Sequence, residues 1–101
     1  LKIGCSGIIT ATCNVTAKLS RKVYDDFINN RPQSVNNNLC AIRKVFDEYN
    51  LISGIHSFLG EKDEDCKNIL PTLSILNNQD QQILLNKLKK LNFINRNYKA
   101  A

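Results

Sequence analysis

Four cysteines and one histidine are the residues in this 101-residue sequence best suited to metal or thiol chemistry. Cys5, Cys13, Cys40 and Cys66 lie far apart, and no two of them form the C-x-x-C pair typical of zinc sites. His56 is the one imidazole that could join them. We therefore expect no metal site and no cofactor. The cysteines are predicted to be small buried or half-buried apolar residues in a reducing compartment, and His56 a hydrogen-bonded histidine without a catalytic role.

A second group with possible chemistry is the acidic stretch Glu61 to Asp65, which reads E-K-D-E-D. Four carboxylates close together could attract a divalent ion. The stretch lacks the glycine turn and the distal glutamate of an EF-hand loop, so we predict an exposed, solvated loop.

The net charge of +5 suggests a nucleic-acid partner until the charges are located. Residues 1 to 80 carry all nine acidic side chains and an equal number of Lys and Arg. The excess comes from the terminal residues Lys87, Lys89, Lys90, Arg96 and Lys99. Cations at the end of a helix favour its dipole, and no stacking aromatics alternate with these residues. We expect a solvated terminus and no nucleic-acid partner.

The apolar runs are interrupted every few residues by Asn, Lys or Asp, and none approaches the roughly 20 residues that cross a bilayer. The stretch Leu1 to Ala17 has Thr, Asn and Cys where a secretory signal needs a continuous apolar core. The expectation is a cytoplasmic protein without a membrane partner.

Apolar residues at helical spacing predict three helices in the first sixty residues: from Asn14 or Thr16 to about Asn29, from Pro32 or Ser34 to Tyr49, and from Leu51 to Leu59. Asn14 and Thr16 are the candidate N-caps of the first helix. Gly60 is expected to take the left-handed conformation that often follows a helix C-terminus.

The remaining sequence predicts an extended strap and a final helix. Ile69 to Leu76 is apolar but contains Pro71, which favours a strap laid over the helices above a paired strand. Asn77 or Asn78 is expected to cap the last helix, whose buried stripe is Ile83, Leu84, Leu88 and Leu91. Asn95 to Ala101 is predicted to be a frayed terminus.

The opening residues are different in kind. Gly7 to Thr12 is a short β-branched run that suits one buried strand. Everything after it predicts helix, and unpaired buried backbone groups are costly. The strand must therefore pair with another chain or with residues outside this sequence.

This order of elements resembles the C-terminal end of the dihydrodipicolinate synthase and N-acetylneuraminate lyase family. Gly7 to Val15, G-I-I-T-A-T-C-N-V, is similar to that family's last barrel strand, of the form G-V-I-S-x-T-x-N-V. Ala41 to Phe46 precedes Asn50 to Ser53, where the family often has P-x-x-P, and Ile69 to Leu73 is similar to its R-x-P-L strap. The resemblance covers nearly the whole chain.

The resemblance implies a TIM barrel with a C-terminal helical extension. Residues 1–30 would supply the last strand and helix of the barrel, and residues 31–101 the extension, so that this chain is mainly α, with one β-strand and about four helices. Members of the family are class I aldolases or lyases that bind pyruvate or another 2-keto acid as a Schiff base. Their lysine and proton-relaying tyrosine lie on earlier strands. Lys2 and Lys18 do not match that lysine, so the isolated chain is expected to be inactive.

The same resemblance implies a substrate-binding role for Ile9, Thr10, Ala11 and Thr12 at the mouth of the barrel. The main chain of Ile9 lies beside pyruvate in relatives, and Thr12 is equally well explained as a residue of the strand core. The implied partners are the missing barrel portion, or another chain pairing with the strand, and further copies in a homo-oligomer. The alternative is a free-standing helical module that binds a protein partner through its strand or an apolar seam.

Overall fold

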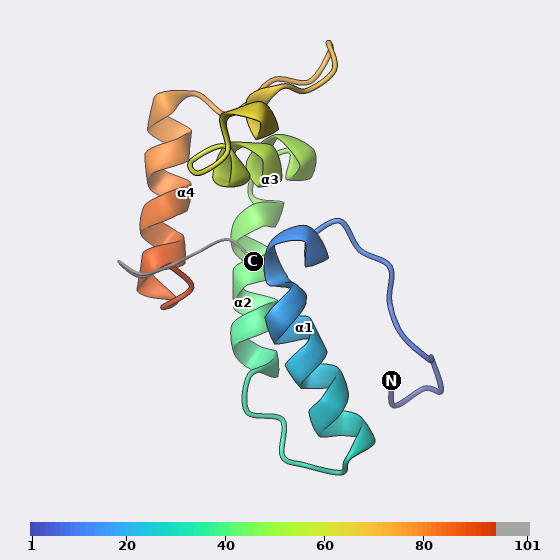
Figure 1. Cartoon of the computed structure of the whole chain (residues 1–101). Coiled ribbons are helices and arrows are strands. Elements are labelled where there is room, and N and C mark those ends of the chain that lie inside the picture. The colour runs from blue at the N-terminus through green and yellow to red at the C-terminus, as the bar shows by residue number, and fades with distance from the viewer. Residues whose placement is uncertain (95–101) are drawn as a thin grey trace.

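The computed structural model of the protein describes residues 1–94 (Figure 1). These residues are mainly α, as predicted, and form no β-strand. The elements are α1 (Cys13–Ile28), α2 (Asn36–Asp47), α3 (Leu51–Leu59), the short 3-10 helix η1 (Glu64–Lys67) and α4 (Asn78–Lys90). Within this part of the chain, no helix combines the length and the apolar character needed to span a membrane.

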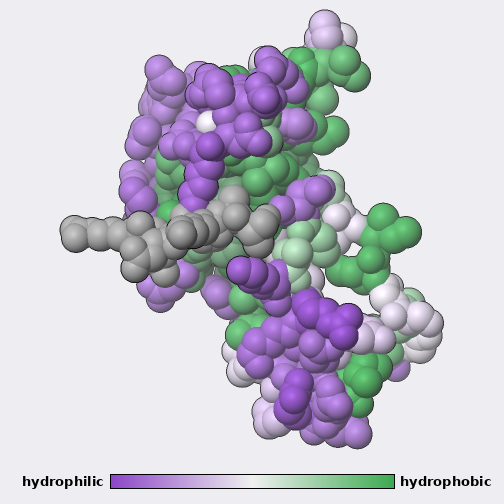
Figure 2. Space-filling model, viewed as in Figure 1, coloured by the Kyte–Doolittle hydropathy of each residue, from purple (hydrophilic) through white to green (hydrophobic). Residues whose placement is uncertain are grey.

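Residues 1–12, which we call the opening segment, do not form the strand expected at Gly7 to Thr12. The segment runs beside α1 without regular structure (Figure 1). Residues 5–9 exchange no backbone hydrogen bonds within the described part of the chain. Ile3, Ile8 and Ile9 are strongly exposed, and Figure 2 shows apolar surface on this side of the molecule. A strand needs a hydrogen-bonded neighbour, and these residues supply none.

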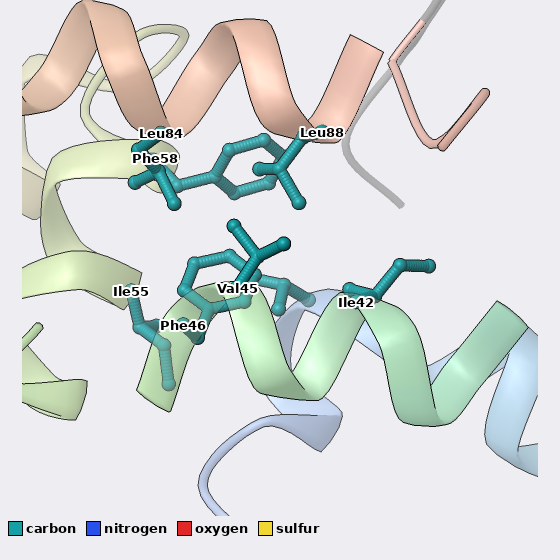
Figure 3. Packing of buried hydrophobic residues seen from close by; sticks show 8 residues of the cluster. Ile42, Val45, Phe46, Ile55, Phe58, Leu84 and Leu88 are labelled. Carbon is teal, nitrogen blue, oxygen red and sulfur yellow. The ribbon is translucent and has the colours of Figure 1, made fainter. Parts of the chain in front are cut away.

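The core lies between α2 and the three helices packed on it. It consists of buried side chains from all four helices: Val15, Ile42, Val45, Phe46, Ile55, Phe58, Leu84 and Leu88. In Figure 3, Leu84 and Leu88 of α4 point across the core toward α2. Phe46 and Phe58 meet edge to face, with ring centroids 5.9 Å apart. Their apolar burial is what orders the helices, because short isolated helices are marginal in water.

The predicted N-caps of α1 are wrong. The amide of Asn14 donates to the Ala11 carbonyl, and the Thr16 hydroxyl donates to the Thr12 carbonyl at 3.0 Å. Both residues lie inside the first turns, and Thr16 has non-helical angles (φ −115°, ψ 17°) that kink the helix. A threonine that bonds back to the preceding turn commonly bends a helix. Thr12 occupies the N-cap position but makes no side-chain capping bond.

Helix α2 begins later than predicted, because Arg31 to Ser34 stay in the exposed connection. Helix α3 has the predicted bounds, and Asn50 caps it by accepting a hydrogen bond from the Ser53 amide at 3.1 Å. Gly60 follows α3 with φ −62°, so its expected left-handed conformation is wrong. The glycine is required for space: a Cβ at this position would lie 2.6 Å from Lys67 Cγ.

The expected strap does not lie over the helices. Asn68 to Ile75 projects beyond α3 as a narrow loop (Figure 1), and Leu70 is 83% exposed. A turn bond joins the Leu73 amide to the Leu70 carbonyl, and Thr72 at the turn has φ +79°. That conformation is strained for a β-branched residue.

The chain returns to the core where the Leu76 amide donates to Ser57 Oγ at 2.7 Å. Asn77 then caps α4 as predicted, accepting from the Asp80 amide at 2.8 Å. Leu84 and Leu88 of the predicted stripe are fully buried and Leu91 is half-buried, whereas Ile83 is exposed. The frayed end predicted for residues 95–101 lies outside the described residues.

Candidate functional site

The four predicted site residues lie where the opening segment enters α1, and they divide between two faces. Ile9 and Ala11 are exposed to solvent. Thr10 is half-buried, and Thr12 is only 4% exposed. The chain is not extended at this point, because the Cys13 amide donates to the Thr10 carbonyl and Thr12 has helical angles (φ −63°, ψ −24°), so the two faces are those of the turn into α1. The structure therefore gathers the two threonines on the inner face and leaves the other two residues outside.

The residue that organises this junction is Arg43 of α2, which the sequence did not single out. Its Nη1 donates to Thr12 Oγ1 at 2.7 Å and lies 3.4 Å from Thr10 Oγ1. Its Nε donates to Asp47 Oδ1 at 2.8 Å. Only the Arg43–Asp47 pair has the helical spacing that a sequence can reveal. The contact with Thr12 spans 31 residues and needed the fold.

The side chains that meet at the junction are the hydroxyls of Thr10 and Thr12 and the guanidinium group of Arg43, which can bind and orient a polar group. Lys2 and Lys18 are both exposed, whereas an amine nucleophile is activated by desolvation or by a neighbouring cation. Among residues 1–94 no group of three or more His, Cys, Asp or Glu side chains could hold a metal ion. What the junction offers is the main chain of Ile8 and Ile9, which makes no backbone hydrogen bond within the described part of the chain and can pair with a polar ligand or a neighbouring strand.

The four thiols are free, and two of them are more exposed than predicted. Cys5 and Cys40 are exposed, so the expectation of burial is wrong for these two, and Cys13 and Cys66 are half-buried. Burial, with a further contribution from the nearby Asp63 carboxylate, raises the pKa of the Cys66 thiol, which disfavours the reactive thiolate. His56 Nδ1 lies 2.6 Å from the Cys66 carbonyl, so the histidine is hydrogen-bonded as predicted.

The acidic stretch is exposed, as predicted, and its side chains bond locally. Asp63 caps η1 by accepting from the Asp65 amide at 3.2 Å, and Glu64 pairs with Lys67 at 2.8 Å. Glu61 accepts a hydrogen bond from the Gln81 side chain. These contacts hold the loop on the outside of α3 and α4 and do not converge on a common point.

A groove of about 560 Å³ separates the opening segment from the helices. One wall consists of Leu1, Ile3 and Ile8, and the other of Val23, Tyr24, Phe27 and Leu39 from α1 and α2. The groove is therefore mainly apolar. It lies between the opening segment and the face of α1 that carries Val23, Tyr24 and Phe27.

Comparisons with protein families, with curated proteins and with solved structures found no match to this chain.

Proposed function

We propose that this chain is the C-terminal part of a pyruvate-dependent Schiff-base aldolase or lyase, resembling 4-hydroxy-tetrahydrodipicolinate synthase. The observation that carries the proposal is the stretch Gly7 to Val15, whose sequence is similar to the last barrel strand of that family. The backbone of its first three residues, Gly7 to Ile9, is unpaired, as a strand separated from its neighbours would be. The order that follows, one helix and then a helical extension, supports the same assignment.

In this proposal Gly7 to Thr12 becomes the eighth strand of a TIM barrel once its neighbours are present. Residues 1–30 then complete the barrel, and residues 31–101 form the extension. The exposed isoleucines of the opening segment and the apolar face of α1 support the proposal, because both are surfaces that a barrel would cover. The proposed setting is a cytoplasmic homo-oligomer.

The proposed ligand is pyruvate or another 2-keto acid, held near Ile9, Thr10, Ala11 and Thr12. The Schiff-base lysine and the proton-relaying tyrosine would come from residues outside this chain. Lys2 precedes the strand-like stretch and Lys18 lies in α1, so neither matches the family's lysine, which is on an earlier strand.

Borohydride trapping tests this proposal. The chain is incubated with pyruvate and borohydride, and its intact mass is read. No reduced adduct is expected for residues 1–101, and one adduct per chain is expected for the protein that includes residues encoded upstream of Leu1. A stoichiometric adduct on the 101-residue chain, or the absence of any encoded upstream barrel, would contradict the proposal.

A second candidate is a free-standing helical module that binds a protein partner. The observation that favours it is the shared core: all four helices contribute buried side chains, and no buried polar side-chain atom of the described residues lacks a partner. A module of this kind is expected to be monomeric and to unfold cooperatively. The end of a barrel is expected to self-associate through its unpaired backbone.

A further inference from the structure

We propose that Arg43 is a positioning residue that holds the opening segment against α2 and thereby positions the unpaired main chain of Ile9. The presentation of that main chain to a ligand rests on the proposed function. The hydrogen bonds from Arg43 to Thr12 and Thr10, which we call the tether, rest only on the contacts described above.

The first support is the geometry of the tether. The guanidinium group donates to Thr12 Oγ1 at 2.7 Å, and the receiving side chain is 4% exposed. Hydrogen bonds from a charged donor are stronger than neutral ones, and a buried hydroxyl that loses its partner retains the cost of its desolvation. The bond from Arg43 Nε to Asp47 fixes the direction of the guanidinium group, so the tether is held at both ends.

The second support is that Thr12 does not use its hydroxyl as a cap. Threonine at an N-cap position ordinarily accepts a hydrogen bond from an amide in the first turn. Here the N-cap of α1 makes no such bond, and its hydroxyl accepts from Arg43 instead. The link to α2 therefore replaces a local bond that this residue type commonly forms.

The third support is the difference in exposure between neighbouring side chains of the segment. Thr10 and Thr12 face Arg43, whereas Ile9 and Ala11 are exposed to solvent. Without these hydrogen bonds the opening segment could rotate, and the unpaired main chain of Ile9 would change its direction. Arg43 thus acts on a ligand only through the two threonines.

Hydrogen exchange measures the tether directly. The amides of Cys13 and Asn14 donate to the carbonyls of Thr10 and Ala11, so they report whether the segment stays in place. Replacing Arg43→Met is expected to speed exchange at these two amides by about tenfold relative to the amides of α3 and α4. The matched control is Arg21→Met, which also removes an Arg–Asp pair at i,i+4 spacing on a helix but touches no residue of the segment.

Threonine variants test the same hydrogen bond from the other side, and they do so even if Arg43→Met fails to fold. Thr12→Val keeps the shape of the side chain and is expected to reproduce the faster exchange, whereas Thr12→Ser restores the hydroxyl and is expected to restore slow exchange. Equal exchange in Arg43→Met and Arg21→Met would overturn the tether, as would faster exchange throughout all four helices.

The expected effect of Arg43 on pyruvate binding is measured separately, in the longer protein that traps pyruvate. There Arg43→Met is expected to raise the pyruvate concentration for half-maximal trapping by about tenfold, with Arg21→Met unchanged. An unchanged value for Arg43→Met would overturn the link to the ligand. If the wild-type protein traps no pyruvate, the proposed function and the effect of Arg43 on pyruvate binding are both wrong. The hydrogen-exchange result still tests whether Arg43 holds the opening segment.

Discussion

Asp26, near the end of α1, is the only charged side chain that is buried among residues 1–94. Its carboxylate accepts from Lys22 Nζ at 3.1 Å and from Arg31 Nε at 3.0 Å. The Asp26 carbonyl also accepts from the Arg31 amide at 2.7 Å. One buried acid therefore fixes both the end of α1 and the first residues of the connection to α2.

The pKa of Asp26 is lowered from its ordinary value of 3.8, mainly by the hydrogen bond from Lys22, against the raising effect of burial, with Arg31 adding to the lowering. Because the folded-state pKa is below the unfolded one, the carboxylate stabilises the fold above about pH 3.8, and this stabilisation is lost as the pH falls through the folded-state value.

The variant Asp26→Asn is therefore expected to have a lower urea midpoint at neutral pH than the wild type. The difference should narrow below pH 3.8, where the wild-type carboxylate also becomes neutral. Urea unfolding followed by circular dichroism over a series of pH values measures both effects. Asp25→Asn is the neighbouring control, because Asp25 pairs with the exposed Arg21. An equal loss of stability in the two variants would contradict the role of Asp26.

The sequence revealed the two threonines of the junction but not their partner. Thr10 and Thr12 stand out as hydroxyl residues beside a β-branched run. Arg43 is spaced as the partner of Asp47, and linear spacing carries no sign that its guanidinium group also reaches residues before α1. Local pairs are visible in a sequence, whereas contacts between elements depend on how the elements pack.

Among the elements, the existence of the helices was predictable and some of their ends were not. Apolar spacing located all four, and Asn50 and Asn77 cap α3 and α4 through their own side chains. The start of α1 was missed because Thr16 bonds back to the Thr12 carbonyl. The strand at Gly7 to Thr12 was predicted from residue types alone, and a strand forms only where another strand pairs with it.

Gly60 shows how the end of one element is set by another. It is followed by η1, and Cγ of Lys67 in η1 would lie only 2.6 Å from a Cβ at Gly60. The conformation of Gly60 is open to any residue, since its φ is −62°. The requirement for glycine at this position therefore comes mainly from the approach of η1 to α3, and the His56 carbonyl of α3 would be a further close contact, 3.0 Å from the added Cβ.

The variant Gly60→Ala is expected to destabilise the fold by about 1 kcal/mol, because overpacking costs about 1–3 kcal/mol and the lost freedom of the unfolded chain returns about 0.4–1 kcal/mol. In a Lys67→Ala background the two contacts with Lys67 are removed and the one with the His56 carbonyl remains, so the same change should cost clearly less. Urea unfolding of the four proteins in this double-mutant cycle measures the coupling. Equal effects in both backgrounds would show that Lys67 is not the obstacle.

On the scale of the whole molecule, the helical core and the opening segment favour different accounts of this chain. The core of α1 to α4 is closed, with Ile42, Phe46 and Leu84 completely buried. The opening segment is open, with unpaired backbone at residues 5–9 and exposed isoleucines beside the groove on α1. A closed core suits a free-standing module, and an open segment suits a barrel strand without its neighbours. The oligomeric state of the chain separates these two accounts.

We expect the 101-residue chain to self-associate through the opening segment, because unpaired strand-like backbone flanked by apolar side chains pairs with any available edge. Ile9→Lys places a charge on the exposed face of that segment and should weaken association by about tenfold or more, while leaving the unfolding midpoint unchanged at concentrations where both proteins are monomeric. Sedimentation over a range of concentrations measures the association. Ile52→Lys is the control, because Ile52 is an exposed isoleucine on α3, remote in sequence from the segment. A wild-type chain that stays monomeric at every concentration would instead favour the helical module, since its opening segment would then have no tendency to pair.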